Sequence, residues 1–188
     1  MQYLVADRAA IGSAAIDPRQ VIAKGEMMVL EGPWPWGAPI VACLDSAADI
    51  RVKAAGVDAY AVEALDDPGG GEAFVVAAHR IRDTWGFRPY VEQVTDIVAR
   101  FGGRFLARGG KVTLFGGNFV PDRAVIIEFP TAADAVAFYL SDIYAPLLKI
   151  RHVTTDPRFV VMARAGVLPA AVRARAEDYL RSRVCPSH

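Results

Sequence analysis

The feature that most constrains this chain is a stretch that occurs twice in the same order. Residues 32–49 read GPWPWGAPIVACLDSAAD, and residues 116–134 read GGNFVPDRAVIIEFPTAAD. Each stretch runs from a glycine-containing turn into an apolar strand, and then to a Ser or Thr that can cap a helix beginning Ala-Ala-Asp. The second begins 84 residues after the first, and after one inserted residue the offset becomes 85 in the strand that follows. This collinear order indicates an internal repeat.

The second half of the chain alternates strand and helix patterns. Apolar β-branched runs, a helical spacing of Val and Ile that ends at Gly102-Gly103, and a capping-box pattern at Thr131 define the elements. A strand over 104–117 is interrupted at Gly109-Gly110 by either a bulge or a turn. The predicted order is strand 72–81, helix from Pro89 to 101, strand or strands 104–117, strand 123–129, helical pieces over 132–153 and strand 157–163. This is the ferredoxin-like βαββαβ plan, so the fold class is α+β.

The first half is a shorter version of the same plan. Strands are expected at 2–6, 26–32, 39–45 and 58–65, with helices over 7–16 and 46–55. The glycine-rich run DDPGGGE around residues 67–71 reads as a linker. The predicted division is an abridged unit over 1–66, the linker 67–71, a complete unit over 72–165, and a C-terminal helix and tail over 166–188. That last helix is either laid on the body of the protein or holds a partner subunit.

Composition excludes several classes of protein. Lys+Arg and Asp+Glu are equal at 21 each, so the chain lacks the basic excess of a nucleic-acid binder and of a protein held on charged lipids. No apolar run approaches a membrane span, and charges come too early for a signal peptide. The cysteines, Cys43 and Cys185, form neither a metal spacing nor a disulfide framework. We expect a soluble cytoplasmic protein with no bound metal.

The second half resembles a known family over residues 72–165. The likeness is carried by YVEQV from Tyr90, FGGRFLARGGKV from Phe101, AVIIEFPTAADAVAFYLSDIY from Ala124, and Arg151-His152. These segments are similar to the bacterial domain-of-unknown-function family DUF 1330, in the dimeric α+β barrel superfamily.

This resemblance implies an architecture. In that superfamily two βαββαβ units usually come from two chains, and their sheets cover each other's apolar faces. A tandem repeat would supply both sheets in one chain as a pseudo-dimer, which still leaves room for a homodimer. Family members typically carry Glu-Gly after the second strand, where this chain has Phe115-Gly116. The first half has Glu31-Gly32 at the matching place, so a function that needs this carboxylate has moved or been lost.

The candidate catalytic residues are His79, Glu128 and Tyr144. His79 ends a strand and is either a proton-transfer group at a pocket mouth or a surface histidine. Glu128 lies in an apolar strand, which requires a partner. It forms a structural ion pair or lines a ligand pocket, with Arg104, Arg108 or Arg151 as its partner.

The candidate ligand-binding residues are Arg104, Arg108, Arg151 and Tyr90. Tyr144 is expected to face the ligand, whereas Tyr139 is expected in the core. Trp34 and Trp36 either close one end of the barrel or cover its core.

Two functions remain open. The first is binding of a small organic molecule, with cofactor-independent catalysis of the monooxygenase, isomerase or cyclase type that the wider superfamily suggests. The second is a non-catalytic structural or assembly module. No nucleotide-binding or metal-binding motif is present in the sequence, so no cofactor is expected.

Overall fold

The computed structural model contains two five-stranded antiparallel sheets, and it describes residues 1–8, 16–45, 58–117 and 119–184. Sheet I has the order β2-β4-β1-β5-β8, and sheet II the order β3-β10-β6-β9-β7. The strands of sheet I are β2 (Val21–Lys24), β4 (Pro39–Leu44), β1 (Gln2–Asp7), β5 (Ala59–Glu63) and β8 (Val112–Gly116). Those of sheet II are β3 (Met27–Glu31), β10 (Thr155–Ala163), β6 (Ala73–Ile81), β9 (Arg123–Phe129) and β7 (Arg104–Arg108).

Each sheet holds four strands from one half of the chain and one strand from the other half. β3 comes from the first half but pairs with β10 in sheet II, and β8 comes from the second half but pairs with β5 in sheet I. The interruption predicted at Gly109-Gly110 is therefore a turn that sends the chain from one sheet to the other. Gly109 and Gly25 enable the two turns, since their φ values of +70° and +90° are unfavourable for residues with a side chain.

The predicted fold class is confirmed, because both sheets have the strand order of a ferredoxin-like unit plus one exchanged strand. Sheet II carries its expected helices. The helices expected over 7–16 and 46–55 fall almost entirely outside the described residues. The short strand β2 was not predicted.

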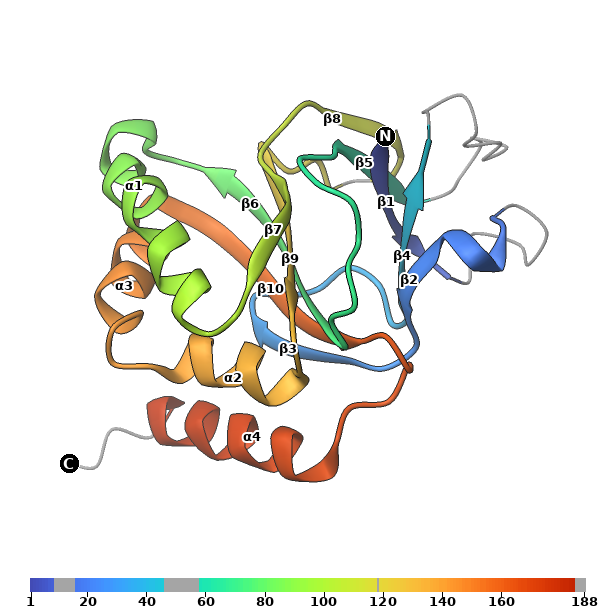
Figure 1. Cartoon of the computed structure of the whole chain (residues 1–188). Coiled ribbons are helices and arrows are strands. Elements are labelled where there is room, and N and C mark those ends of the chain that lie inside the picture. Colours follow the sequence, from blue (N-terminus) through green and yellow to red (C-terminus); the bar gives the residue numbers. More distant parts are fainter. Residues whose placement is uncertain (9–15, 46–57, 118, 185–188) are drawn as a thin grey trace.

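The two sheets face each other, and their inner faces form a continuous apolar core (Figure 1). Side chains alternate between the two faces of a strand, so each sheet contributes every second residue to this core. From sheet II these are Phe74, Val76, Ala78, Leu106, Ala124, Ile126, Val160 and Met162; from sheet I they include Tyr3, Val5, Val41, Tyr60 and Val62. Both faces of sheet II are thus buried, as the apolar sequence of its strands predicts.

The helices cover the outer face of sheet II (Figure 1). They are α1 (Thr84–Arg100), α2 (Ala132–Leu140), α3 (Ala145–Thr154) and α4 (Ala170–Val184); the short 3-10 helix η1 (Pro18–Gln20) precedes β2. α1 begins at Thr84 rather than at Pro89 as predicted, because the Asp83 side chain caps it by accepting a hydrogen bond from Gly86 N. The capping box predicted at Thr131 is present.

The C-terminal helix α4 lies on the body of the protein, against α2 and β3 (Figure 1). Ala176 is buried, and the Tyr179 ring lies 6.2 Å from that of Tyr139, edge to face. This matches the first of the two roles that the sequence left open for it. Among the described helices, none has the length and apolar character needed to cross a membrane.

The strand pairing corrects one detail of the comparison between the halves. Glu31 lies opposite Phe159 in sheet II, and the position in the same place in sheet I is Gly116, which lies opposite Ala59. The extra residue is therefore in the turn before Val112 and not after Gly116. The structural counterpart of Glu31 is Gly116, not Phe115.

Candidate functional site

The outer face of sheet II, beneath α1 and α3, carries a buried group of polar side chains that we call the His79 chamber. His79 is at the end of β6 and only 1% exposed, so it is neither a surface residue nor at an open pocket mouth. Its Nδ1 has no hydrogen-bond partner. Burial and the nearby Arg151 lower the pKa of His79 to about 3, so the imidazole is neutral at physiological pH.

Aromatic side chains on the helix side of the chamber extend from His79 through Phe87 to two tyrosines. Tyr90 of α1 stacks on Phe87, with ring centroids 4.9 Å apart, and Phe87 in turn lies edge-on to His79. The Tyr90 hydroxyl is 3.2 Å from that of Tyr144, at hydrogen-bonding distance. Tyr144 precedes α3 and is fully buried, and this burial raises its pKa well above the usual value. Of the two tyrosines predicted for the site, Tyr90 lines the cavity described below, whereas Tyr144 is not part of its lining.

Arg151 of α3 is fully buried and forms an ion pair with Glu31 of β3. Tyr139 donates a hydrogen bond of 2.6 Å to the same carboxylate, and His152 Nε2 lies 3.2 Å from it. Burial raises the pKa of Glu31, but Arg151, His152 and Tyr139 outweigh this effect and lower it below its usual range. Glu31 was not among the predicted site residues, although the Glu31-Gly32 comparison was the signal that could have identified it.

The ion pair with Glu31 leaves part of the Arg151 guanidinium without hydrogen-bond partners among the described residues. Nε and Nη1 are buried and have no hydrogen-bond partner. The guanidinium lies over the Phe159 ring, with Cζ 4.7 Å from the centroid, and farther from the rings of Tyr90 and Tyr144. Aromatic faces attract a cation but do not accept its N–H groups as a carboxylate or water does.

Next to this group lies a cavity of about 10 Å³ between α1 and the sheet. Two further cations, Arg108 and Arg123, line it together with His79 and Tyr90. Within the described part of the chain, Arg108 donates to the backbone oxygen of Val91, at 2.5 Å, and Arg123 makes a weak contact with the Arg108 carbonyl at 3.4 Å. Neither forms an ion pair with any carboxylate among residues 1–8, 16–45, 58–117 and 119–184. Burial, then Arg108, lowers the pKa of Arg123.

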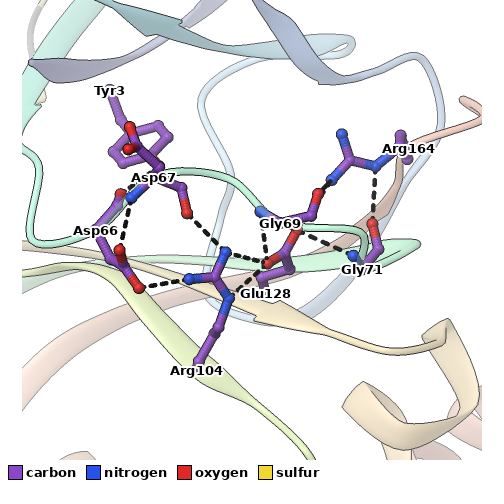
Figure 2. Close-up of polar contacts among 8 residues, drawn as sticks. All are labelled: Tyr3, Asp66, Asp67, Gly69, Gly71, Arg104, Glu128 and Arg164. Carbon is purple, nitrogen blue, oxygen red and sulfur yellow. Dashed lines mark hydrogen bonds and ion pairs between the residues drawn. The ribbon is translucent and has the colours of Figure 1, made fainter.

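Glu128 is buried elsewhere, against the linker (Figure 2). Its partners are Arg104 at 2.8 Å and Arg164 at 2.9 Å, and it also accepts hydrogen bonds from Gly69 N and Gly71 N. Of the three arginines proposed as partners, only Arg104 contacts it, while Arg108 and Arg151 lie in the His79 chamber. Arg164, the second partner, was not among the residues predicted from the sequence.

This Glu128 cluster also fixes the linker to both sheets. Arg104 donates to the Asp66 carboxylate at 2.5 Å and to Asp67 O at 2.6 Å, and Tyr3 of β1 donates to Asp66 O at 2.7 Å (Figure 2). Each oxygen of Glu128 therefore has a partner in this arrangement, as expected for a buried carboxylate. An open pocket of about 380 Å³ adjoins the cluster.

The structure therefore divides the predicted site residues into two groups. His79, Tyr90, Arg108, Tyr144 and Arg151 come together in the chamber, whereas Glu128 and Arg104 lie in the separate cluster. Within the described part of the chain, no three His, Cys, Asp or Glu side chains are grouped to hold a metal ion.

Comparison with known proteins identifies a family over half of the chain. The family model described as Domain of unknown function (DUF1330) matches residues 72–165, the segment that contributes every chamber residue except Glu31. No curated protein matches the chain.

Proposed function

The chain belongs to this DUF1330 family, and we propose that it binds a small organic anion, such as a short carboxylate, in the His79 chamber. The observation that carries the proposal is the surplus of unpaired polar groups around one buried cavity. Arg108 and Arg123 line the cavity without an ion pair to any described carboxylate, and beside it two nitrogens of Arg151, the partner of Glu31, have no hydrogen-bond partner among the described residues. Buried polar groups are almost always satisfied in folded proteins, so such a set calls for a ligand or ordered water.

The charges favour an anion over a neutral molecule. Arg108 and Arg123 line the cavity from β7 and β9, and charge-assisted hydrogen bonds from arginine to a carboxylate are among the strongest in proteins. Tyr90 supplies a hydroxyl from the helix side. The neutral His79 adds a ring nitrogen without a further charge.

The size of the cavity limits the ligand. About 10 Å³ holds roughly one water molecule, so a ligand of several atoms requires α1 to move outward from the sheet. α1 closes the cavity with Tyr90, Val91 and Val94, and its remaining residues are largely exposed. Formate and acetate need the smallest movement, and larger carboxylates need more.

The low pKa of His79 favours binding over general-base catalysis. A catalytic base works best when its pKa is near the operating pH, and this imidazole stays neutral down to about pH 3. The alternative is a purely structural role for the protein. That role does not explain why two arginines line the cavity.

The chamber can be tested by NMR of the histidine side chains in the full chain. The sequence has three histidines, so the spectrum contains few imidazole signals. The signal that is lost in a His79→Gln variant is that of His79. Titration with formate or acetate at pH 7 is expected to shift the His79 signal in a saturable way. Arg123→Gln is expected to weaken binding at least about tenfold, because it removes a hydrogen bond to a charged group.

Arg100→Gln provides the matched control. Arg100 is an exposed arginine at the end of α1, far from the cavity lining, and its replacement is expected to leave the affinity unchanged. An equal loss in both variants would indicate non-specific anion binding and overturn the proposal. The absence of any saturable shift with formate, acetate and benzoate would overturn it as well.

A further inference from the structure

A second pocket lies at one end of the space between the two sheets, and it is independent of the chamber. It has a volume of about 250 Å³ and is lined by Pro35, Trp36, Asp58, Gly116, Gly117, Phe119 and Arg158. We call it the Trp36 pocket. Arg158 pairs with Ala78 across β10 and β6, one residue before the pairing of Phe159 with Ala77. Side chains alternate along a strand, so Arg158 points to the inner face while Phe159 points to the chamber.

The pocket contains one positive and one negative side chain that are not paired with each other. Asp58 and Arg158 form no ion pair and no side-chain hydrogen bond with any residue in the described part of the chain. The face of the Arg158 guanidinium rests on the Phe119 ring, with Cζ 3.6 Å from the centroid. Stacking occupies the face of a guanidinium and leaves its in-plane N–H groups free to bind a carboxylate.

Aromatic rings form the apolar wall of the pocket. Trp36 is almost fully buried, lies edge-on to Trp34 with centroids 5.8 Å apart, and is 6.0 Å from Tyr60. Behind this wall the Tyr60 hydroxyl and Trp34 Nε1 are both buried and have no hydrogen-bond partner. The sequence left open whether the tryptophans close a barrel end, and their position at this pocket agrees with that role.

The backbone at the pocket keeps Asp58 close to the end of β8. Gly117 has a φ of +91°, and a Cβ on it would overlap the Asp58 carboxylate. Only glycine combines that conformation with so close an approach. The position of the acid is therefore determined by the fold and not by a partner cation.

We propose that the Trp36 pocket binds a small zwitterion, an α-amino acid with an apolar or aromatic side chain. Arg158 binds its carboxylate, Asp58 binds its ammonium group, and the side chain packs on Trp36. A simple anion is repelled by Asp58 and a simple cation by Arg158, whereas a zwitterion satisfies both charges. The volume of about 250 Å³ suits a molecule no larger than a single-ring compound.

Tryptophan fluorescence of the full chain tests this proposal. L-Phenylalanine and L-leucine are the probes, and phenethylamine and 3-phenylpropionate are the same skeleton with one charge each. A saturable change is expected with at least one of the two amino acids, and affinity at least about tenfold lower for either single-charge compound, since each lost charge contact is worth that factor. Arg158→Met and Asp58→Asn are each expected to weaken amino-acid binding by a similar factor.

Two controls locate the signal. The sequence has three tryptophans, and Trp85 is 81% exposed on α1, so Trp85→Phe is expected to retain the fluorescence change. Arg123→Gln, which alters the chamber, is expected to leave amino-acid binding unchanged, and this separates the pocket from the proposed anion site. Equal affinity for phenylalanine and 3-phenylpropionate would overturn the proposal, as would no response to either amino acid.

Discussion

Glu31 and Glu128 are both buried carboxylates paired with arginines, yet their surroundings differ. Glu128 has two arginines and two backbone N–H groups, and its arginines are also bonded to the linker (Figure 2). Glu31 has one fully buried arginine, Arg151, which keeps two nitrogens without a partner. A saturated cluster holds chain segments together, whereas an unsaturated one leaves capacity for a ligand. The two carboxylates therefore differ in how fully the arginines around them are paired, which the residue type alone does not reveal.

Among these variants, Glu31→Leu is expected to cause the largest loss of stability. This change leaves Arg151 charged and unpaired in the core, and breaking such a pair from one side costs about 3–5 kcal/mol of unfolding free energy. The double variant Glu31→Leu with Arg151→Met is expected to recover most of that loss, because no buried charge remains. Urea denaturation measures both. A single variant within about 1 kcal/mol of wild type would contradict the burial of this pair.

A smaller loss, about 2–3 kcal/mol, is expected for Glu128→Ala. The side chains of Arg104 and Arg164 are 39% and 37% exposed, so water can solvate them once the carboxylate is gone. Asp96→Ala, on the exposed side of α1, is the matched control and is expected to change stability by less than about 0.5 kcal/mol. If Glu128→Ala matched Glu31→Leu under the same urea protocol, the distinction between the two carboxylates would fail.

The smallest expected effect is on the pH dependence of stability, and it depends on His79. The folded pKa of His79, about 3, is below its usual value of 6.5, so the unfolded state binds more protons between these values. His79 therefore makes the protein less stable as pH falls from 6.5, by about 1.4 kcal/mol per pH unit. His79→Gln is expected to remove this slope between pH 6.5 and 5.

The pH window matters for this measurement. Glu31 has a folded pKa below its usual 4.5, so its contribution to stability is retained above that pH and lost only at more acidic values. Urea midpoints at pH 5, 5.5, 6 and 6.5 thus report on His79 without interference from Glu31. An unchanged slope in the variant would show that His79 is not held neutral in the folded chain.

Several features of the fold followed from short-range patterns. The alternation of strands and helices over 72–165, the capping box at Thr131, and the interruption at Gly109-Gly110, predicted as either a bulge or a turn, are properties of a few neighbouring residues. Such signals depend on local geometry, so they are legible in a single sequence. The requirement that Glu128 find a partner also followed directly, since a carboxylate in an apolar strand cannot remain unpaired.

The contacts between charged residues that are distant in the sequence could not be predicted in this way. Glu31 and Arg151 are 120 residues apart, and nothing near either residue specifies the other. Their contact depends on β3 leaving its own half to join β10 in sheet II. In the same way, Asp58 and Arg158 reach one pocket from different sheets. These side chains come together because the two sheets pack face to face, and that packing is a global property of the fold.

The sequence by itself determined the α+β class and the family to which residues 72–165 belong. Only the tertiary structure decided that His79 is buried, that Glu31 rather than Glu128 joins Arg151, and that Arg158 and Asp58 line one pocket without an ion pair to any described residue. The physical reason is the distance along the sequence over which each effect acts. Periodicity and capping act over a few residues, whereas burial and charge pairing depend on which distant strands come to share a sheet.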